Sequence, residues 1–215
     1  LFMNFISEKL LNYCISHSSK ESEILKELNR QTHIRTLNPR MICGKHQGRF
    51  LSMISKIIRP KRILEIGTFT GYSTLCLAEG LEKNGRIDTI DNNFELKKIQ
   101  SYFFNLSKLQ NQINQFTCDA IKILPKLKDK YDLIFLDADK KNYLNYLNLI
   151  VPLLKKKGVL VSDNVLWSGK VLNKSKNKDI ETEVLKKFNQ QLSNHKNLET
   201  VLLPIRDGIS LSMKI

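Results

Sequence analysis

The sequence lacks any apolar run close to the roughly 20 residues that a membrane-spanning helix needs. Its mean hydropathy is -0.28. The N-terminus also lacks the basic segment, the clean apolar core and the small-residue cleavage site of a signal peptide. We therefore expect a cytoplasmic protein without a membrane segment. The chain begins with Leu1 rather than methionine, so its true start stays open, with Met3 as one candidate.

Cysteine is scarce, and its spacing excludes a common class of metal site. The 215 residues contain four cysteines, with no C-x-x-C pair among them. A structural zinc site needs clustered ligands, which this spacing does not offer. The pattern predicts four free thiols in a reducing compartment.

Acidic residues are few in comparison with basic ones. The chain has 35 Lys and Arg against 21 Asp and Glu, which gives a net charge of +14. Such a surplus can indicate an anionic partner such as a nucleic acid. Most of the surplus is lysine in a chain that is also rich in Asn and Ile, as in a proteome that drifts toward AT-rich codons. Both interpretations stay open.

The hydrophobic pattern changes at Pro60. Before it, helical spacing predicts three helices, the second capped by Ser19 or Ser22. After it, short apolar segments predict seven strands, at 63–66, 87–90, 113–117, 133–136, 159–161, 199–203 and 209–214. Helices separate most of these strands, whereas the last two are close enough to form a hairpin. The lysine-rich residues 170–178 are expected to form a loop.

This alternation predicts an α/β fold with a mostly parallel seven-stranded sheet and an antiparallel edge hairpin. We expect residues 60–215 to form the core of the domain. Residues 1–59 would add helices to the same domain, cover the ligand site and offer a possible dimer interface.

Acidic side chains recur where the predicted strands end. In open α/β sheets, ligands bind outside the carboxyl ends of the strands. Five successive strands are followed there by polar groups: Glu65 with Gly67, Asp91, Asp119, Asp137, and Asp163 with Asn164. Helix capping explains one or two such residues, but it does not easily explain five.

The first loop, LEIGTFTGYST, is suited to an extended ligand. Gly67 and Gly71 permit a tight turn with close backbone approach, and Ser73 can bind a carboxylate at the start of the next helix. Asp91 follows the second strand, where an acid can hold two ribose hydroxyls. The loop therefore predicts a nucleoside ligand, without deciding between S-adenosylmethionine and NAD.

A second group of residues has the chemistry of a metal site. Asp137, Asp163 and Asn164 offer only oxygen ligands, which suit Mg²⁺, Mn²⁺ or Ca²⁺. Lys140 follows three residues after Asp137 and is a candidate general base beside a bound cation.

Several stretches together resemble one family: GKHQGRFLSMI, RILEIGTFTGYSTLCLAEGL, GRIDTID, CDAIKILP, YDLIFLDADKKNY, GVLVSDNVLWSGKV and TVLLPIRDGISL. They are similar, in the same order, to metal-dependent S-adenosylmethionine O-methyltransferases of the catechol and caffeoyl-CoA type. The bacterial branch is the nearest in character, because the plant-type insertions are not evident. The resemblance implies a Rossmann-like class I methyltransferase fold.

The resemblance also implies roles for matching residues. S-adenosylmethionine would be contacted by Met41, Glu65, Gly67, Ser73, Asp91, Asp119, Ala120 and Asp137. Asp137, Asp163 and Asn164 would hold a divalent cation, with Mg²⁺ the first expectation and Mn²⁺ or Ca²⁺ as alternatives. Lys140 would be the general base. The reaction implied is methyl transfer to a hydroxyl of a catechol-like small molecule, by a protein that is commonly a homodimer.

Three other functions make different demands on the sequence. Some relatives methylate 5-hydroxyuridine in tRNA, and the basic residues would suit RNA phosphates. An NAD-dependent dehydrogenase would have the fingerprint G-x-G-x-x-G, which this loop lacks. A non-catalytic binding module would not need Lys140 and all three metal positions.

Overall fold

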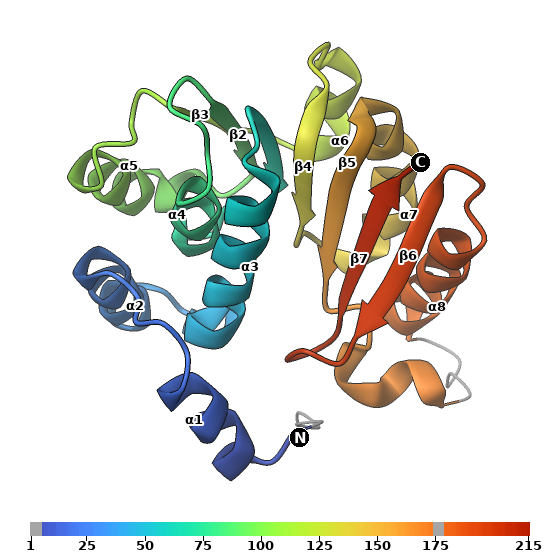
Figure 1. The fold of residues 1–215 in the computed structure, drawn as a ribbon, viewed down its shortest axis with the longest axis horizontal. Coiled ribbons are helices and arrows are strands. Elements are labelled where there is room, and N and C mark those ends of the chain that lie inside the picture. Colours follow the sequence, from blue (N-terminus) through green and yellow to red (C-terminus); the bar gives the residue numbers. More distant parts are fainter. Residues whose placement is uncertain (1–5, 174–178) are drawn as a thin grey trace. The chain divides into compact units, whose positions relative to one another are not determined.

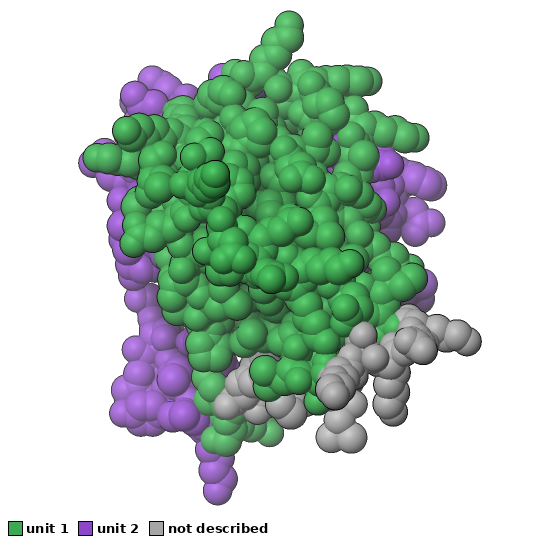
Figure 2. Space-filling view, turned by 90° about the vertical axis from the view of Figure 1, so that its right-hand side faces the viewer, with its two compact units in different colours: residues 1–8, 121–215 green, residues 9–120 purple. Residues whose placement is uncertain are grey.

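The chain folds into two compact units in the computed structural model, which describes residues 6–173 and 179–215. Unit 2 is Lys9–Ala120, and unit 1 is Ile121–Ile215 with the residues up to Glu8. Figure 2 colours the two units separately. Each unit is described below by itself.

Unit 2 contains three parallel strands, in the order β3-β2-β1 (Figure 1). The strands are β1 (Arg62–Ile66), β2 (Arg86–Asp91) and β3 (Ile113–Thr117). The helices are α1 (Glu8–Ser16), α2 (Glu23–Arg35), α3 (Gly44–Ile58), α4 (Tyr72–Ala78) and α5 (Lys97–Leu106), with the 3-10 turns η1 (Pro39–Met41) and η2 (Phe94–Leu96). A short helix, α6 (Ala120–Ile123), begins at the end of this unit.

Unit 1 contains four strands in the order β4-β5-β7-β6 (Figure 1). They are β4 (Tyr131–Leu136), β5 (Leu154–Asp163), β6 (Leu198–Leu203) and β7 (Ile209–Lys214). The pair β4–β5 is parallel, whereas β7 runs antiparallel to both β5 and β6. The helices are α7 (Tyr143–Ile150) and α8 (Ile180–Ser193), with the 3-10 turns η3 (Leu124–Lys126), η4 (Lys140–Asn142), η5 (Val151–Leu153) and η6 (Trp167–Leu172).

The seven strands confirm the expected fold class. Three strand pairs are parallel, and the hairpin β6–β7 supplies the antiparallel edge. Most residues of the parallel strands β1, β2 and β4 are buried, as expected when helices cover a sheet, whereas β3 is only partly buried. In β4, for example, the four side chains of Leu133, Ile134, Phe135 and Leu136 have no exposed surface.

The structure decides the open cap of the second helix and corrects two other predicted boundaries. Ser22, and not Ser19, caps α2, because the Ser22 hydroxyl accepts a hydrogen bond from the Leu25 N–H at 3.3 Å. The fifth strand begins at Leu154 rather than at residue 159, because Leu154 pairs with Tyr131 across the sheet. The sequence pattern of Leu75, Leu77 and Leu81 predicts that the helix after the first strand runs through Leu81, whereas α4 ends at Ala78.

The early end of α4 follows from close packing against α3. An added Cβ at Gly80 would lie 2.1 Å from the backbone carbon of Ser55. The predicted loop over 170–178 is also only partly right. Residues up to Leu172 belong to the turn η6, and residues 174–178 lie outside the described part of the chain. The helical spacing that predicts the first helix includes Phe2 and Phe5. The helix is seen from Glu8, and these two residues lie outside the described part of the chain.

All four cysteines are free thiols, as predicted, and Cys43 and Cys76 are buried. In the described part of the chain, no helix is both long and apolar enough to cross a membrane.

An ion pair joins α3 to the end of α4 in unit 2. The Glu79 carboxylate accepts hydrogen bonds from Arg49 at 2.5 Å, from Ser52 at 2.7 Å and from Lys56 at 2.8 Å. Burial alone would raise the pKa of Glu79, but these donors outweigh it and lower the pKa from 4.5 to about 2. The pair therefore stabilises the folded state fully above pH 4.5, and its contribution is lost as the pH falls toward 2.

We expect Glu79→Gln to lower the free energy of unfolding at neutral pH by about 2 kcal/mol. The difference from the unsubstituted protein should shrink as the pH falls from 4.5 toward 2, because protonation then removes the same charge. Urea denaturation at several pH values measures this difference. Glu82→Gln is the matched control and should have little effect. A Glu79→Gln difference that does not change with pH would contradict the assignment.

Candidate functional site

Glu65 is a fully buried carboxylate near the end of β1. Its Oε2 accepts hydrogen bonds from the Thr89 hydroxyl of β2 at 2.6 Å and from the Thr74 hydroxyl of α4. Two neighbouring elements thus fix this carboxylate, which lies beside the loop that begins at Gly67. The position agrees with the sequence prediction for Glu65, although its role there stays a prediction.

Asp91 ends β2 and organises the loop that follows β1. Its Oδ2 accepts from the Phe69 N–H at 2.7 Å, and its Oδ1 accepts from the Asn93 N–H at 2.8 Å. Burial raises the pKa of Asp91, and these backbone donors oppose the rise. The backbone N–H groups of Thr68 and Asn92 also oppose the rise, so main-chain donors from both strand ends stabilise this carboxylate.

The loop between β1 and α4 is shaped by left-handed residues. Gly67, Phe69 and Gly71 all have positive φ, at 99°, 47° and 93°. An added Cβ at Gly71 would lie 2.6 Å from the Phe104 ring, so only glycine fits there. The loop leads into α4, whose first turn carries Ser73, buried at 9% exposure.

Asp119, Ala120 and Met41 are the remaining predicted cofactor residues of unit 2. Asp119 and Ala120 follow β3, and the neighbouring Cys118 N–H donates to the Asp91 carbonyl at 2.9 Å. They therefore share the strand-end edge with Asp91. Met41 lies outside this cluster, on η1, and its side chain is 58% exposed.

In unit 1, the ends of β4 and β5 bring the predicted metal ligands side by side. Leu136 pairs with Ser162 in the parallel register, so Asp137 and Asp163 come next on neighbouring strands. Asp163 has no exposed surface, and its Oδ1 accepts from the Asn164 N–H at 2.7 Å. Its Oδ2 lies 3.9 Å from the Arg206 guanidinium.

Lys140 connects the two strand ends. Its buried Nζ donates to Asp137 Oδ1 at 2.9 Å and to the Tyr143 hydroxyl at 2.9 Å. The Tyr143 hydroxyl in turn donates to the Asp163 backbone carbonyl at 2.9 Å. Burial would lower the pKa of Lys140, but the nearby charge of Asp137 outweighs it and raises the pKa above its ordinary value. As the residues stand, Lys140 is an ammonium group.

Asn164 begins a loop of unusual backbone conformation after β5. It adopts φ of 59°, which asparagine tolerates better than most residues. Its Nδ2 donates at 3.3 Å to Oδ2 of Asp207, which lies in the loop before β7. The other oxygen of Asp207 accepts the Ser168 N–H.

The structure therefore arranges the predicted residues as two clusters. Glu65, Gly67, Ser73, Asp91, Asp119 and Ala120 belong to the first, in unit 2. The second, in unit 1, contains Asp137, Lys140, Asp163 and Asn164. Among the described residues, no three His, Cys, Asp or Glu side chains form a metal-binding group, and the predicted metal set itself has only two carboxylates.

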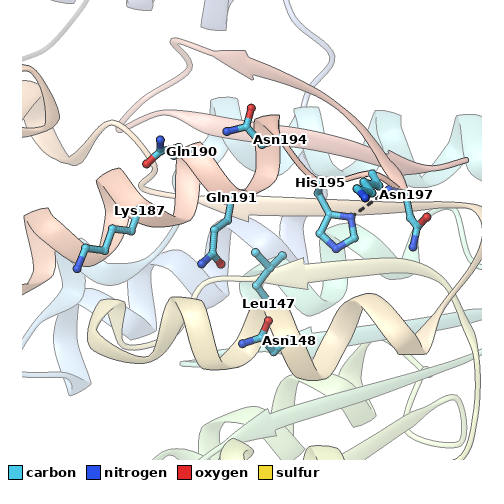
Figure 3. A pocket seen from close by; sticks show the side chains of 9 residues that line it. Leu147, Asn148, Lys187, Gln190, Gln191, Asn194, His195 and Asn197 are labelled. Carbon is cyan, nitrogen blue, oxygen red and sulfur yellow. Dashed lines mark hydrogen bonds between the residues drawn. The ribbon is translucent and has the colours of Figure 1, made fainter.

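Two cavities lie away from these clusters. One of about 670 Å³ in unit 1 lies between α7 and the end of α8, and Figure 3 shows its amide-rich lining, including Asn148, Gln191 and Asn194. A second cavity of about 460 Å³ lies in unit 2, between Ser22, Arg49 and Leu109. Neither is lined by a predicted site residue.

Sequence reasoning missed the residues that hold the clusters in place. Tyr143 was interpreted only as an apolar position on a helix, although its hydroxyl joins Lys140 to β5. Asp207 is not among the predicted site residues. It lies in the turn RDG of the predicted hairpin, and this position of a polar residue is the one signal in the sequence that points to it. Its contact with Asn164 depends on strand register, which the sequence does not reveal.

The fold and the strand-end carboxylates define an α/β protein with a polar site at the ends of its strands. A family model described as "O-methyltransferase" matches residues 15–215. The chain therefore belongs to the O-methyltransferase family.

Curated relatives span nearly the whole chain. It is 34% identical to tapetum-specific methyltransferase 1 of Arabidopsis thaliana, over 97% of this chain and 94% of the relative. It is 31% identical to probable caffeoyl-CoA O-methyltransferase 2 of Dictyostelium discoideum, over 97% and 93% of the two chains. The family prediction is thus confirmed, whereas the bacterial branch and the metal dependence stay predictions.

Solved structures give the same result. An O-methyltransferase from Bacillus cereus in complex with SAH superposes with a TM-score of 0.89 at 25% identity, over 96% of this chain and 97% of that one. TomG from Streptomyces achromogenes, an O-methyltransferase of tomaymycin synthesis in complex with SAM, gives 0.88 at 26% identity, over 97% and 99%.

We expect Tyr143→Phe to lower the free energy of unfolding by about 1–3 kcal/mol, because it leaves the buried Asp163 carbonyl and Lys140 each without one hydrogen-bond partner. Urea denaturation measures the change. Tyr102→Phe removes a hydroxyl from a side chain that is 62% exposed and should change stability little. Equal effects from the two substitutions would show that the Tyr143 hydroxyl does not stabilise this cluster.

Proposed function

We propose that the protein is an S-adenosylmethionine-dependent and divalent-cation-dependent O-methyltransferase that acts on catechol-like small molecules with vicinal hydroxyls. The observation that carries this proposal is the second cluster. Two carboxylates, an asparagine and a buried lysine lie at neighbouring strand ends in a member of the O-methyltransferase family. A methyltransferase that worked without a metal ion would have no evident use for these four side chains together.

The first cluster is the proposed S-adenosylmethionine site. Asp91, whose oxygens accept backbone N–H groups, is proposed to hold the two ribose hydroxyls. Glu65 and Ser73 are proposed to contact the methionine end, Gly67 to allow its close approach, and Asp119 with Ala120 to lie against the adenine. Met41 is proposed to cover the ligand, and Asp137 is proposed as a further cofactor contact. The cofactor-bound relatives from Bacillus cereus and Streptomyces achromogenes support this choice of cofactor over NAD.

The second cluster fits a hard divalent cation. Asp137, Asp163 and Asn164 are proposed as its ligands, and all three offer oxygen, which Mg²⁺ prefers. The Asn164 amide nitrogen is engaged by Asp207, which leaves the amide oxygen as its ligand atom. A bound cation would act as a Lewis acid that favours the ionised form of the acceptor hydroxyl.

Lys140 is the proposed proton acceptor. Its Nζ is held by hydrogen bonds to Asp137 and Tyr143, so it has one well-defined position. The charge of Asp137 now keeps the pKa of Lys140 high. The neutral, basic form therefore requires that this charge be engaged elsewhere, which is the arrangement proposed for Asp137 as a metal ligand.

The acceptor is proposed to be a small molecule rather than tRNA. The relatives reported above include an enzyme named for caffeoyl-CoA. The lysines that would favour RNA include Lys174, Lys176 and Lys178, which lie outside the described residues. We further propose a homodimer in which the N-terminal helices take part, because Leu10 and Tyr13 of α1 are 53% and 60% exposed.

The acceptor is tested by labelled methyl transfer from S-adenosylmethionine in the presence of Mg²⁺. A catechol acid and bulk unmodified tRNA serve as parallel acceptors. We expect label on the catechol acid. Label on tRNA alone would overturn the proposed substrate class and assign a function to the positive charge.

We expect Asp91→Asn to raise the dissociation constant for S-adenosylmethionine about tenfold or more, because a hydrogen bond to a charged acceptor contributes roughly 1.5–3 kcal/mol. Isothermal titration calorimetry measures this constant. Glu95→Gln, on the exposed turn η2 of the same unit, is the control and should bind as the unsubstituted protein does. Unchanged affinity in Asp91→Asn would remove Asp91 from the cofactor site.

A further inference from the structure

The loop that carries Asn164 is fixed by the turn that precedes β7. Asp163 pairs with Ile209 in the antiparallel register, and the pairing continues beyond the strand ends. The Val165 N–H donates to the Gly208 carbonyl at 3.1 Å, and the Leu166 N–H donates to the Asp207 carbonyl at 3.0 Å. Residues 164–166 and 207–208 are therefore held together by their backbones.

The contact leaves no space for a side chain at Gly208. Its φ is 88°, and an added Cβ would lie 2.4 Å from Leu166 Cγ. This close approach brings the Asp207 side chain over the loop. One Asp207 oxygen accepts the Ser168 N–H, and the other accepts from Asn164 Nδ2 at 3.3 Å.

These contacts determine which way the Asn164 amide points. An ionised carboxylate can only accept hydrogen bonds, so the group of Asn164 that faces Asp207 must be its NH₂ group. The amide oxygen is then directed away from Asp207. We propose that Asp207 is a positioning residue for the metal site, which orients Asn164 so that its oxygen, and not its NH₂ group, is presented to a divalent cation.

This inference rests on the proposed metal site and adds to it a residue that does not itself bind the cation. Partners that orient a ligand from outside the coordination sphere typically change metal affinity by about 10- to 100-fold when they are replaced. Asp207 is suited to this role because both of its oxygens are used, one for the loop backbone and one for the ligand amide.

Asp207→Asn tests the proposal with almost no change of shape. An amide at position 207 has one oxygen and one NH₂ group. It therefore cannot replace both carboxylate oxygens, one of which accepts from Ser168 and the other from Asn164. We expect the dissociation constant for Mn²⁺ alone, measured by electron paramagnetic resonance of the free ion, to rise about 10-fold or more. Asp132→Asn is the matched control in the same unit. It breaks an ion pair with Lys155 near the start of β4 and should leave Mn²⁺ affinity unchanged.

A double-mutant cycle separates orientation from simple loss of charge. In an Asn164→Ala background, Asp207→Asn should weaken Mn²⁺ binding no further, because no amide remains to be oriented. An equal loss in both backgrounds would overturn the proposal, as would unchanged affinity in the single variant.

A swapped pair covers the case in which Asp207→Asn does not fold. In Asn164→Asp with Asp207→Asn, the new amide donates to position 164 and accepts from Ser168, so both hydrogen bonds and the net charge are retained. We expect this protein to fold and to bind Mn²⁺ at least as tightly as the unsubstituted chain. Weak binding by a folded swapped pair would contradict the inference. No Mn²⁺ binding by the unsubstituted protein would instead overturn the proposed metal site itself.

Discussion

Buried carboxylates need hydrogen-bond donors, and this requirement shapes the loops at the ends of the strands. Glu65 and Asp163 have no exposed surface. An ion that is taken out of water is costly by several kcal/mol unless neighbouring groups stabilise its charge. Threonine hydroxyls serve Glu65, whereas the Asn164 backbone N–H serves Asp163. The residues around these acids are therefore constrained before any ligand is considered.

The same requirement explains how much the sequence could predict. Apolar segments that end in acids indicated the strands and the strand-end residues, because the type of a residue largely determines its polarity and its tendency to be buried. The contacts that support these residues were not visible. Asp207 lies 43 positions from Asn164, and only the antiparallel register of β5 and β7 brings them together. Likewise, the apolar pattern places the start of the fifth strand at residue 159, whereas the pairing of Leu154 with Tyr131 begins it earlier.

The two clusters divide the proposed chemistry between them. In unit 2, hydrogen-bond acceptors and a turn of left-handed residues suit a nucleoside ligand. In unit 1, oxygen ligands and a hydrogen-bonded lysine suit the activation of a hydroxyl. Except for Asp137, which is proposed to contact both the cofactor and the cation, each proposed ligand belongs to one cluster, so the two kinds of binding can be probed by separate substitutions. Membership of the O-methyltransferase family supports the single reaction that we propose for the two clusters.

The central claim is that methyl transfer by this protein depends on a divalent cation. The most direct test measures labelled methyl transfer to a catechol acid before chelation, after removal of metal by chelation and dialysis, and after addition of Mg²⁺. S-adenosylmethionine binding is followed in parallel. The account predicts that transfer falls to background without metal and returns with Mg²⁺, while cofactor binding persists. Equal transfer rates with and without metal would contradict it.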